Sequence, residues 1–154
     1  MARHLLTLHA GSGVVAFGAG CAALRRRQWL VAYVVALVGL VLFLSVVVAI
    51  DWRGLSTTAR ALYCALLALG VYMLGRAVQA RRLVSDRGAP ASVRYLDHIG
   101  FTLVALFDGF AIVTAVDLGA PGWLVAVIGA GGAGVGHLTI QLHKRTLFGA
   151  PPTD

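Results

Sequence analysis

The chain has 154 residues, of which 59% are hydrophobic and only 12% are charged. Soluble globular domains carry about 25% charged and roughly 45–50% apolar residues, so this composition excludes an ordinary soluble domain and predicts a small integral membrane protein. The formal charge is +7. The basic residues lie between apolar runs, which argues against nucleic-acid binding and makes them indicators of membrane topology.

Five apolar runs approach or exceed the length of about 20 residues that a helix needs to cross a bilayer. In chain order they cover approximately residues 5–24, 29–50, 58–76, 96–116 and 123–142. They predict an all-α, polytopic transmembrane bundle that forms one domain over residues 1–154. We expect a basic cytoplasmic loop over residues 77–95 and a flexible C-terminal tail over residues 147–154.

The distribution of basic residues predicts the orientation. Ten of the thirteen Lys and Arg residues fall on one side of the five spans, and Arg3, Arg53 and Arg60 fall on the other. Because positively charged loops stay in the cytoplasm, we expect a multi-pass protein of the bacterial inner membrane with its N-terminus outside and its C-terminus inside. Three arginines follow the first run, where a cleaved signal peptide would have a small-residue cleavage site, so this run is expected to stay in the protein.

The first and fourth runs share the pattern H-x-G-x-x-x-V-A-x-x-x-G, which starts at His9 and at His98. The run that follows each of them opens with W-L-V-A, at Trp29 and at Trp123. Because the first and fourth spans run in opposite directions, the pattern predicts two helical hairpins, spans 1–2 and 4–5, related as an inverted repeat of the kind found in transporters. The alternative is a chance resemblance between helices rich in Gly, Ala and Val.

Small residues form stripes along three of the spans, at the spacing of one helix face. The stripes contain Gly13, Ala16 and Gly20 in the first span, Ala105 and Gly109 in the fourth, and Gly129, Gly132 and Gly136 in the fifth. Because small residues let helices approach closely in a membrane, we expect the first and fourth spans to pack antiparallel through their stripes. The stripe in the fifth span predicts a groove for a helix or a ligand. It overlaps a G-x-G-x-x-G pattern, but no strand precedes that pattern, so a nucleotide site is not expected.

Asp108 lies near the middle of the fourth span. An ionisable group at that depth costs at least about 2.5 kcal/mol and normally faces protein or water. We therefore predict a proton or cation site, or a carboxyl that binds a substrate, with His9 and His98 nearby. The alternative is a structural role, in which a protonated Asp108 hydrogen-bonds across helices to Ser12, Tyr63 or a backbone carbonyl.

The histidines suggest a competing chemistry. His98 and His137 lie near the same ends of adjacent antiparallel spans, within about four residues of the same depth, so both rings could ligate one b-type haem or a metal. The alternative is a pair of interfacial histidines that bond to water or to helix ends. Cys21 and Cys64 lack the spacing of a metal or redox motif, and no hydrolase or metalloprotease motif is present, so an enzyme is not expected.

Three segments carry a resemblance to a known family. They read LHAGSGVVAFGAGCAALRRR from Leu8, VYMLGRAVQARR from Val71 and DHIGFTLVALFDGF from Asp97. They resemble a family of small bacterial membrane proteins of unknown function, which has Leu-His then Gly early, a basic end to a middle helix and His-Ile-Gly in a late one. The resemblance makes His9 and His98 the matched positions and implies no activity. The family commonly has a His after the first basic loop, where this chain has Gln28-Trp29-Leu30-Val31.

Three functions therefore remain open. The leading one is the binding or passage of a small solute or proton at an intramembrane site between the first and fourth spans. The second is a redox protein that holds haem b through two histidines. The third is a non-catalytic accessory or scaffold subunit, in a homo-oligomer or with another membrane subunit, whose glycine stripes serve helix packing alone.

Overall fold

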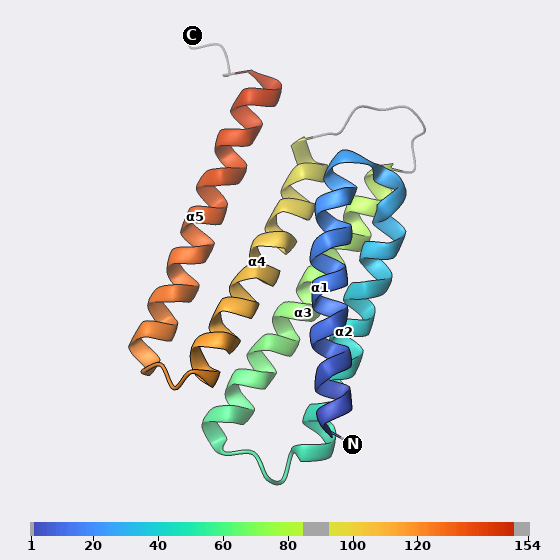
Figure 1. The fold of residues 1–154 in the computed structure, drawn as a ribbon. Coiled ribbons are helices and arrows are strands. Elements are labelled where there is room, and N and C mark those ends of the chain that lie inside the picture. The colour runs from blue at the N-terminus through green and yellow to red at the C-terminus, as the bar shows by residue number, and fades with distance from the viewer. Residues whose placement is uncertain (1, 85–92, 150–154) are drawn as a thin grey trace. The chain divides into compact units, whose positions relative to one another are not determined.

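The computed structural model describes residues 2–84 and 93–149, and nearly all of them are α-helical (Figure 1). The α-helices are α1 (Ala2–Arg25), α2 (Leu30–Asp51), α3 (Thr57–Val84), α4 (Val93–Asp117) and α5 (Gly122–Phe148). A short 3-10 helix, η1 (Arg27–Trp29), joins α1 to α2. The described ranges contain no strand, so the predicted all-α class is confirmed for them.

Each of the five helices contains a stretch long and apolar enough to cross a membrane. These stretches are Thr7–Arg25, Arg27–Asp51, Thr57–Leu83, Arg94–Val116 and Gly122–Leu142. They match the five predicted spans in number and order, which is consistent with a multi-pass membrane protein. A helix suits that setting because it satisfies its backbone hydrogen bonds within the segment.

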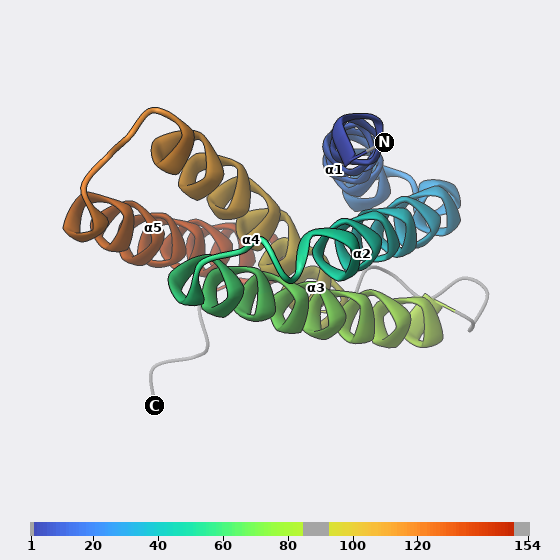
Figure 2. The same ribbon diagram turned by 90° about the horizontal axis from the view of Figure 1, so that it is seen from below.

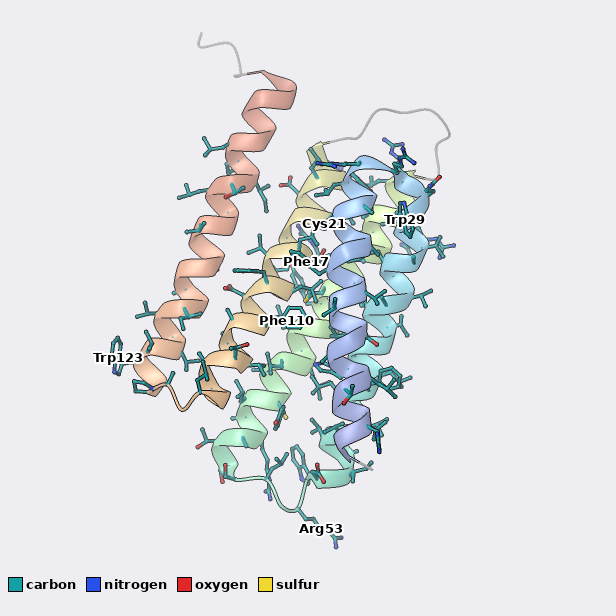
Figure 3. All side chains as sticks on the ribbon, in the orientation of Figure 1. Phe17, Cys21, Trp29, Arg53, Phe110 and Trp123 are labelled. Atoms are coloured by element: carbon teal, nitrogen blue, oxygen red, sulfur yellow. The ribbon has the colours of Figure 1, made fainter. Side chains whose placement is uncertain are left out.

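Tryptophans stand at three helix ends, as expected for aromatic side chains at a membrane–water interface. Trp29, Trp52 and Trp123 are 45%, 41% and 68% exposed. Figure 3 shows Trp123 projecting outward from the first turn of α5. At the start of α3, the Arg60 guanidinium lies over the Trp52 ring, 5.4 Å from its centroid, and Arg60 Nε donates to the Trp52 carbonyl. This arginine therefore lies back against the helix end instead of pointing into the apolar span.

The helix α3 is longer than the span predicted for it. The span was expected to end at Arg76, whereas α3 continues to Val84. Its extra residues include good helix formers such as Gln79 and Ala80, and Ala80 is fully buried. Of the loop expected over residues 77–95, residues 77–84 therefore belong to α3 and residues 93–95 to α4, while residues 85–92 lie outside the described part of the chain. Likewise α5 runs to Phe148, and residues 150–154 of the expected tail lie outside the description.

The chain divides into two compact units, Met1–Val78 and Gln79–Asp154, and the single transmembrane domain over residues 1–154 stays a prediction. In the first unit α1 packs on α2, and in the second unit α4 packs on α5, as Figures 1 and 2 both show. The predicted packing of the first span on the fourth would join the two units, and it stays a prediction.

Glycines mark the close helix contacts of the first unit. A Cβ added to Gly39 of α2 would stand 3.1 Å from Ser12 Oγ of α1, and one added to Gly70 of α3 would stand 2.9 Å from Val41 Cγ2 of α2. Large side chains of α2 fill the remaining core, where Tyr33 and Leu37 are fully buried. Glycines therefore mark close approaches of α2 to α1 and to α3.

Candidate functional site

Three glycines on one face of α5, which we call the glycine row, receive side chains from α4. The contacts pair Gly129 with Ile112, Gly132 with Asp108 and Gly136 with Val104, and a fourth contact pairs Gly100 of α4 with Ile140 of α5. A Cβ on Gly129 would stand 3.1 Å from Ile112 Cδ1, whereas a Cβ on either of the other two glycines would overlap its partner. The row therefore brings the two backbones together, as small residues do between membrane helices.

The other two glycines of the G-x-G-x-x-G pattern lie outside this contact. No described atom comes within 4 Å of the position that a Cβ would take on Gly131 or Gly134. Both residues are exposed, whereas Gly129 faces α4. The pattern is thus divided between two faces of a continuous helix, which is not the strand-to-helix turn that a nucleotide site requires.

Asp108 is the central residue of the site. Its side chain is only 8% exposed, and its carboxyl fills the space that the missing side chain of Gly132 leaves. The Oδ1 atom is buried and has no hydrogen-bond partner among the described residues. Thr102, the other buried polar side chain among the described residues, differs because its hydroxyl donates to the Ile99 carbonyl at 2.9 Å. We call Asp108 together with Gly132 the carboxyl niche.

The surroundings of the niche are apolar on both helices. Residues 128–136 of α5 are Ile, Val, Gly and Ala only, and residues 104–112 of α4 contain no charged or titratable residue other than Asp108. A buried carboxylate needs a counter-charge or several hydrogen-bond donors to be stable. Neither α4 nor α5 offers one within a turn of the niche, so Oδ1 has no donor from either helix of the hairpin.

His9 lies in the first unit and is oriented by α2. The ring is half-buried, and Nδ1 donates a hydrogen bond of 2.9 Å to the Leu40 carbonyl. Because a carbonyl oxygen can only accept, Nδ1 must carry the hydrogen, which leaves Nε2 as the acceptor of the neutral ring. Ser12, the other first-span residue predicted near Asp108, faces Gly39 of α2. The pairing of His9 with Asp108 stays a prediction.

Replacement of His9 by leucine tests the hydrogen bond to Leu40. We expect a loss of about 0.5–1.5 kcal/mol of unfolding free energy, measured by thermal or denaturant unfolding in detergent, because one interhelical hydrogen bond disappears. His9→Asn can retain a donor near the position of Nδ1 and should recover part of the loss. His4→Leu, at an exposed position of the same helix, is the control, and an equal effect of both leucine variants would contradict the assignment.

The contacts of the glycine row also fix the relative depth of the two histidines proposed for haem. The contacts run in opposite directions along α4 and α5, and the same register places His98 level with Leu142 and His137 level with Leu103. The two histidines are thus about five residues apart in depth, or about 7.5 Å along the axis. His137 is exposed, while its neighbour Gly136 faces α4.

These positions do not fit a haem held between α4 and α5. A porphyrin between the helices would have to separate them where the contacts at Gly136 and Gly100 bring them together. The described residues also contain no group of three or more His, Cys, Asp or Glu side chains that could hold a metal ion. We therefore assign neither a haem nor a metal ion to His98 and His137.

The remaining predicted packing residues lie on α1 and α4. Gly13, Ala16 and Gly20 are buried on α1, and Ala105 is buried on α4. Gly109 is half-buried, and no described atom lies within 4 Å of the place where its Cβ would stand. Contact between these two stripes would link one unit to the other, and it stays a prediction.

The fold and the site define a small all-helical protein with five helices able to cross a membrane and a buried carboxyl in its last hairpin. No model of a known protein family, no curated protein and no solved structure matches the chain. The chemistry of the site follows from its own residues, which are a single carboxyl and a glycine row in apolar surroundings.

Proposed function

We propose that the protein binds or passes a small solute or proton at an intramembrane site centred on Asp108. The observation that carries this proposal is the buried Oδ1 without a partner among the described residues. Packing alone would be served better by an apolar residue, because a buried ionisable group costs free energy in the membrane and an unpaired one costs more. A chemical role for the carboxyl accounts for that cost.

The second hairpin by itself supports this site. In the sequence repeat, His9 corresponds to His98 and Leu40 corresponds to Gly134. If both hairpins paired their helices in the same way, the contact of His9 with Leu40 would recur as a contact of His98 with Gly134. In the second hairpin, however, Gly100 lies against Ile140 and Gly134 is exposed. The two hairpins therefore pair their helices in different registers, and the proposed function does not depend on an inverted repeat.

His98 lies ten residues before Asp108 on the same helix, about 15 Å towards the basic end, where it could receive a proton or solute.

The proposed location is the inner membrane of a bacterium, with the N-terminus outside and the C-terminus inside. Basic side chains stand at the helix ends assigned to the cytoplasm. Arg25 lies in the last turn of α1, Arg81 and Arg82 in the last turn of α3, and Arg94 in the first turn of α4. This distribution supports the proposed orientation, since basic residues next to the spans stay on the cytoplasmic side.

Purified protein in sealed vesicles tests the proposed function. Vesicles with the native chain should equilibrate a pH step about tenfold or more faster than vesicles with Asp108→Asn, because a positioned proton-transfer group contributes about 10² or more in rate. If the site passes a solute instead, the same difference is expected for one of methylammonium, urea and glycerol. A trapped pH dye and light scattering are the two readouts. Asp51→Asn, which removes an exposed acid at the end of α2, is the matched control.

Equal rates for the native chain and Asp108→Asn with every probe would contradict the passage of a proton or solute at this site. An Asp108→Asn variant that changed only the unfolding temperature would favour the accessory or scaffold role instead. A Soret band in the purified protein would favour the haem-binding alternative.

A further inference from the structure

We propose that the ligand of the carboxyl niche is a proton, and that this proton controls the packing of α4 on α5. The neutral carboxyl stays beside Gly132, whereas the ionised carboxylate leaves the niche and separates the two helices at that level. This inference rests on the proposed function and narrows its ligand from a small solute or proton to a proton.

The space in the niche argues for the smallest ligand. All three carboxyl atoms of Asp108 lie within 3.0 Å of the position that a Cβ on Gly132 would occupy. One turn away in either direction the glycine row is covered by Ile112 and Val104. No room remains between the buried oxygen and the α5 backbone for a solute, while a proton adds no heavy atom.

The lack of further ligands argues against a metal cation. Calcium takes six to eight oxygen ligands and magnesium takes six. Residues 104–112 of α4 and 128–136 of α5 contain no oxygen-bearing side chain other than Asp108, and Thr102, Thr114 and Thr139 all lie more than a turn and a half from the niche. A proton needs only one oxygen, and Oδ1 of Asp108 supplies it.

The apolar surroundings couple ionisation to movement. The helix that packs on this face of α4 within the unit is α5, and its nearest titratable residue is His137, five positions beyond Gly132 and exposed. The nearest on α4 itself are Asp117 and His98, nine and ten residues from Asp108 and so more than two turns away. Since none of these lies in the niche, neither helix compensates a carboxylate there, and the charged group must move towards water. The released proton passes to water, and the Gly132 contact is lost.

Infrared spectroscopy of the full-length protein in lipid nanodiscs tests the protonation. We expect a protonated-carboxyl band that Asp108→Asn removes, and that the native chain loses as the pH is raised. The band should return when the pH is lowered again. No band dependent on Asp108 at any pH at which the protein stays folded would overturn the inference.

Spin labels test the movement. Val113 on α4 and Val127 on α5 are exposed, at 42% and 58%, and the register places them level with each other. With Cys21 and Cys64 replaced by alanine, the distance between labels at these two sites should lengthen over the pH range in which the band is lost. Asp108→Asn should keep the short distance at every pH.

The outcomes separate this inference from the proposed function. Loss of the band without a change in distance would overturn the coupling, and loss of the band on adding sodium at constant pH would assign a metal cation instead. The vesicle assay is independent of both readouts. If native and Asp108→Asn vesicles conduct equally while band and distance change together, passage is overturned and proton binding stands.

Discussion

Replacement of Gly132 by alanine is expected to expel the Asp108 carboxyl from its niche and to destabilise the α4–α5 hairpin by about 1–3 kcal/mol, the usual cost of an added methylene in a packed contact. The new Cβ would overlap the carboxyl. The carboxyl cannot shift along the glycine row, because Val104 and Ile112 already occupy the space beside Gly136 and Gly129. Denaturant unfolding in detergent micelles, followed by circular dichroism, measures the loss.

Two neighbouring glycines provide matched controls. Gly131→Ala and Gly134→Ala add the same methyl group to the same helix, where no described atom lies within 4 Å, and should stay within about 0.5 kcal/mol of the native chain. Adding Asp108→Ala to Gly132→Ala should restore part of the stability, because the group that the methyl displaces is gone. If Gly132→Ala proved as stable as Gly131→Ala, the carboxyl niche would be wrong.

Replacement of Gly136 by alanine is expected to cost a similar amount, about 1–3 kcal/mol, for a different reason. Its new Cβ would overlap the Val104 side chain and would stand 2.9 Å from Val104 Cβ itself. A β-branched side chain has one strongly preferred rotamer in a helix, so the helices themselves must move apart. The same unfolding measurement applies.

The partner of Gly136 can be verified by rescue. Val104→Ala in combination with Gly136→Ala should recover most of the loss, while Val104→Ala alone should cost less than the glycine variant. Gly129→Ala is the milder comparison, because it meets the flexible end of Ile112 at 3.1 Å. Failure of Val104→Ala to rescue would contradict the antiparallel register of the hairpin.

The paired contacts explain which part of the site the sequence could predict. The glycine row has the three- and four-residue spacing of one helix face, so its members could be grouped from the sequence, and Asp108 could be singled out by its depth in an apolar run. The partner of Asp108 was expected in the first span, near His9. In the structure the carboxyl of Asp108 faces Gly132, and His9 bonds to the Leu40 carbonyl.

A sequence signal for the contact of Asp108 with Gly132 does exist. Only residues 118–121 separate α4 from α5, and Gly119 there adopts a φ of 75°, which favours glycine. So short a connection makes the two helices antiparallel neighbours, and counting nine residues back from Asp117 and nine forward from Gly122 places residue 108 level with residue 131, one position from Gly132. The shared patterns H-x-G and W-L-V-A give no register for this hairpin, because register depends on the turn and on which side chains fit.

The sequence by itself determined the all-helical class and the five helices long and apolar enough to cross a membrane. The physical reason is that hydrophobic runs of that length can satisfy their backbone in lipid only as helices. Only the tertiary structure decided that Gly132 and not another small residue receives Asp108, and that α3 continues past Arg76 to Val84. Small-residue stripes fit many partners equally well, so the choice among them depends on the turn between the helices and on side-chain contacts that span the hairpin.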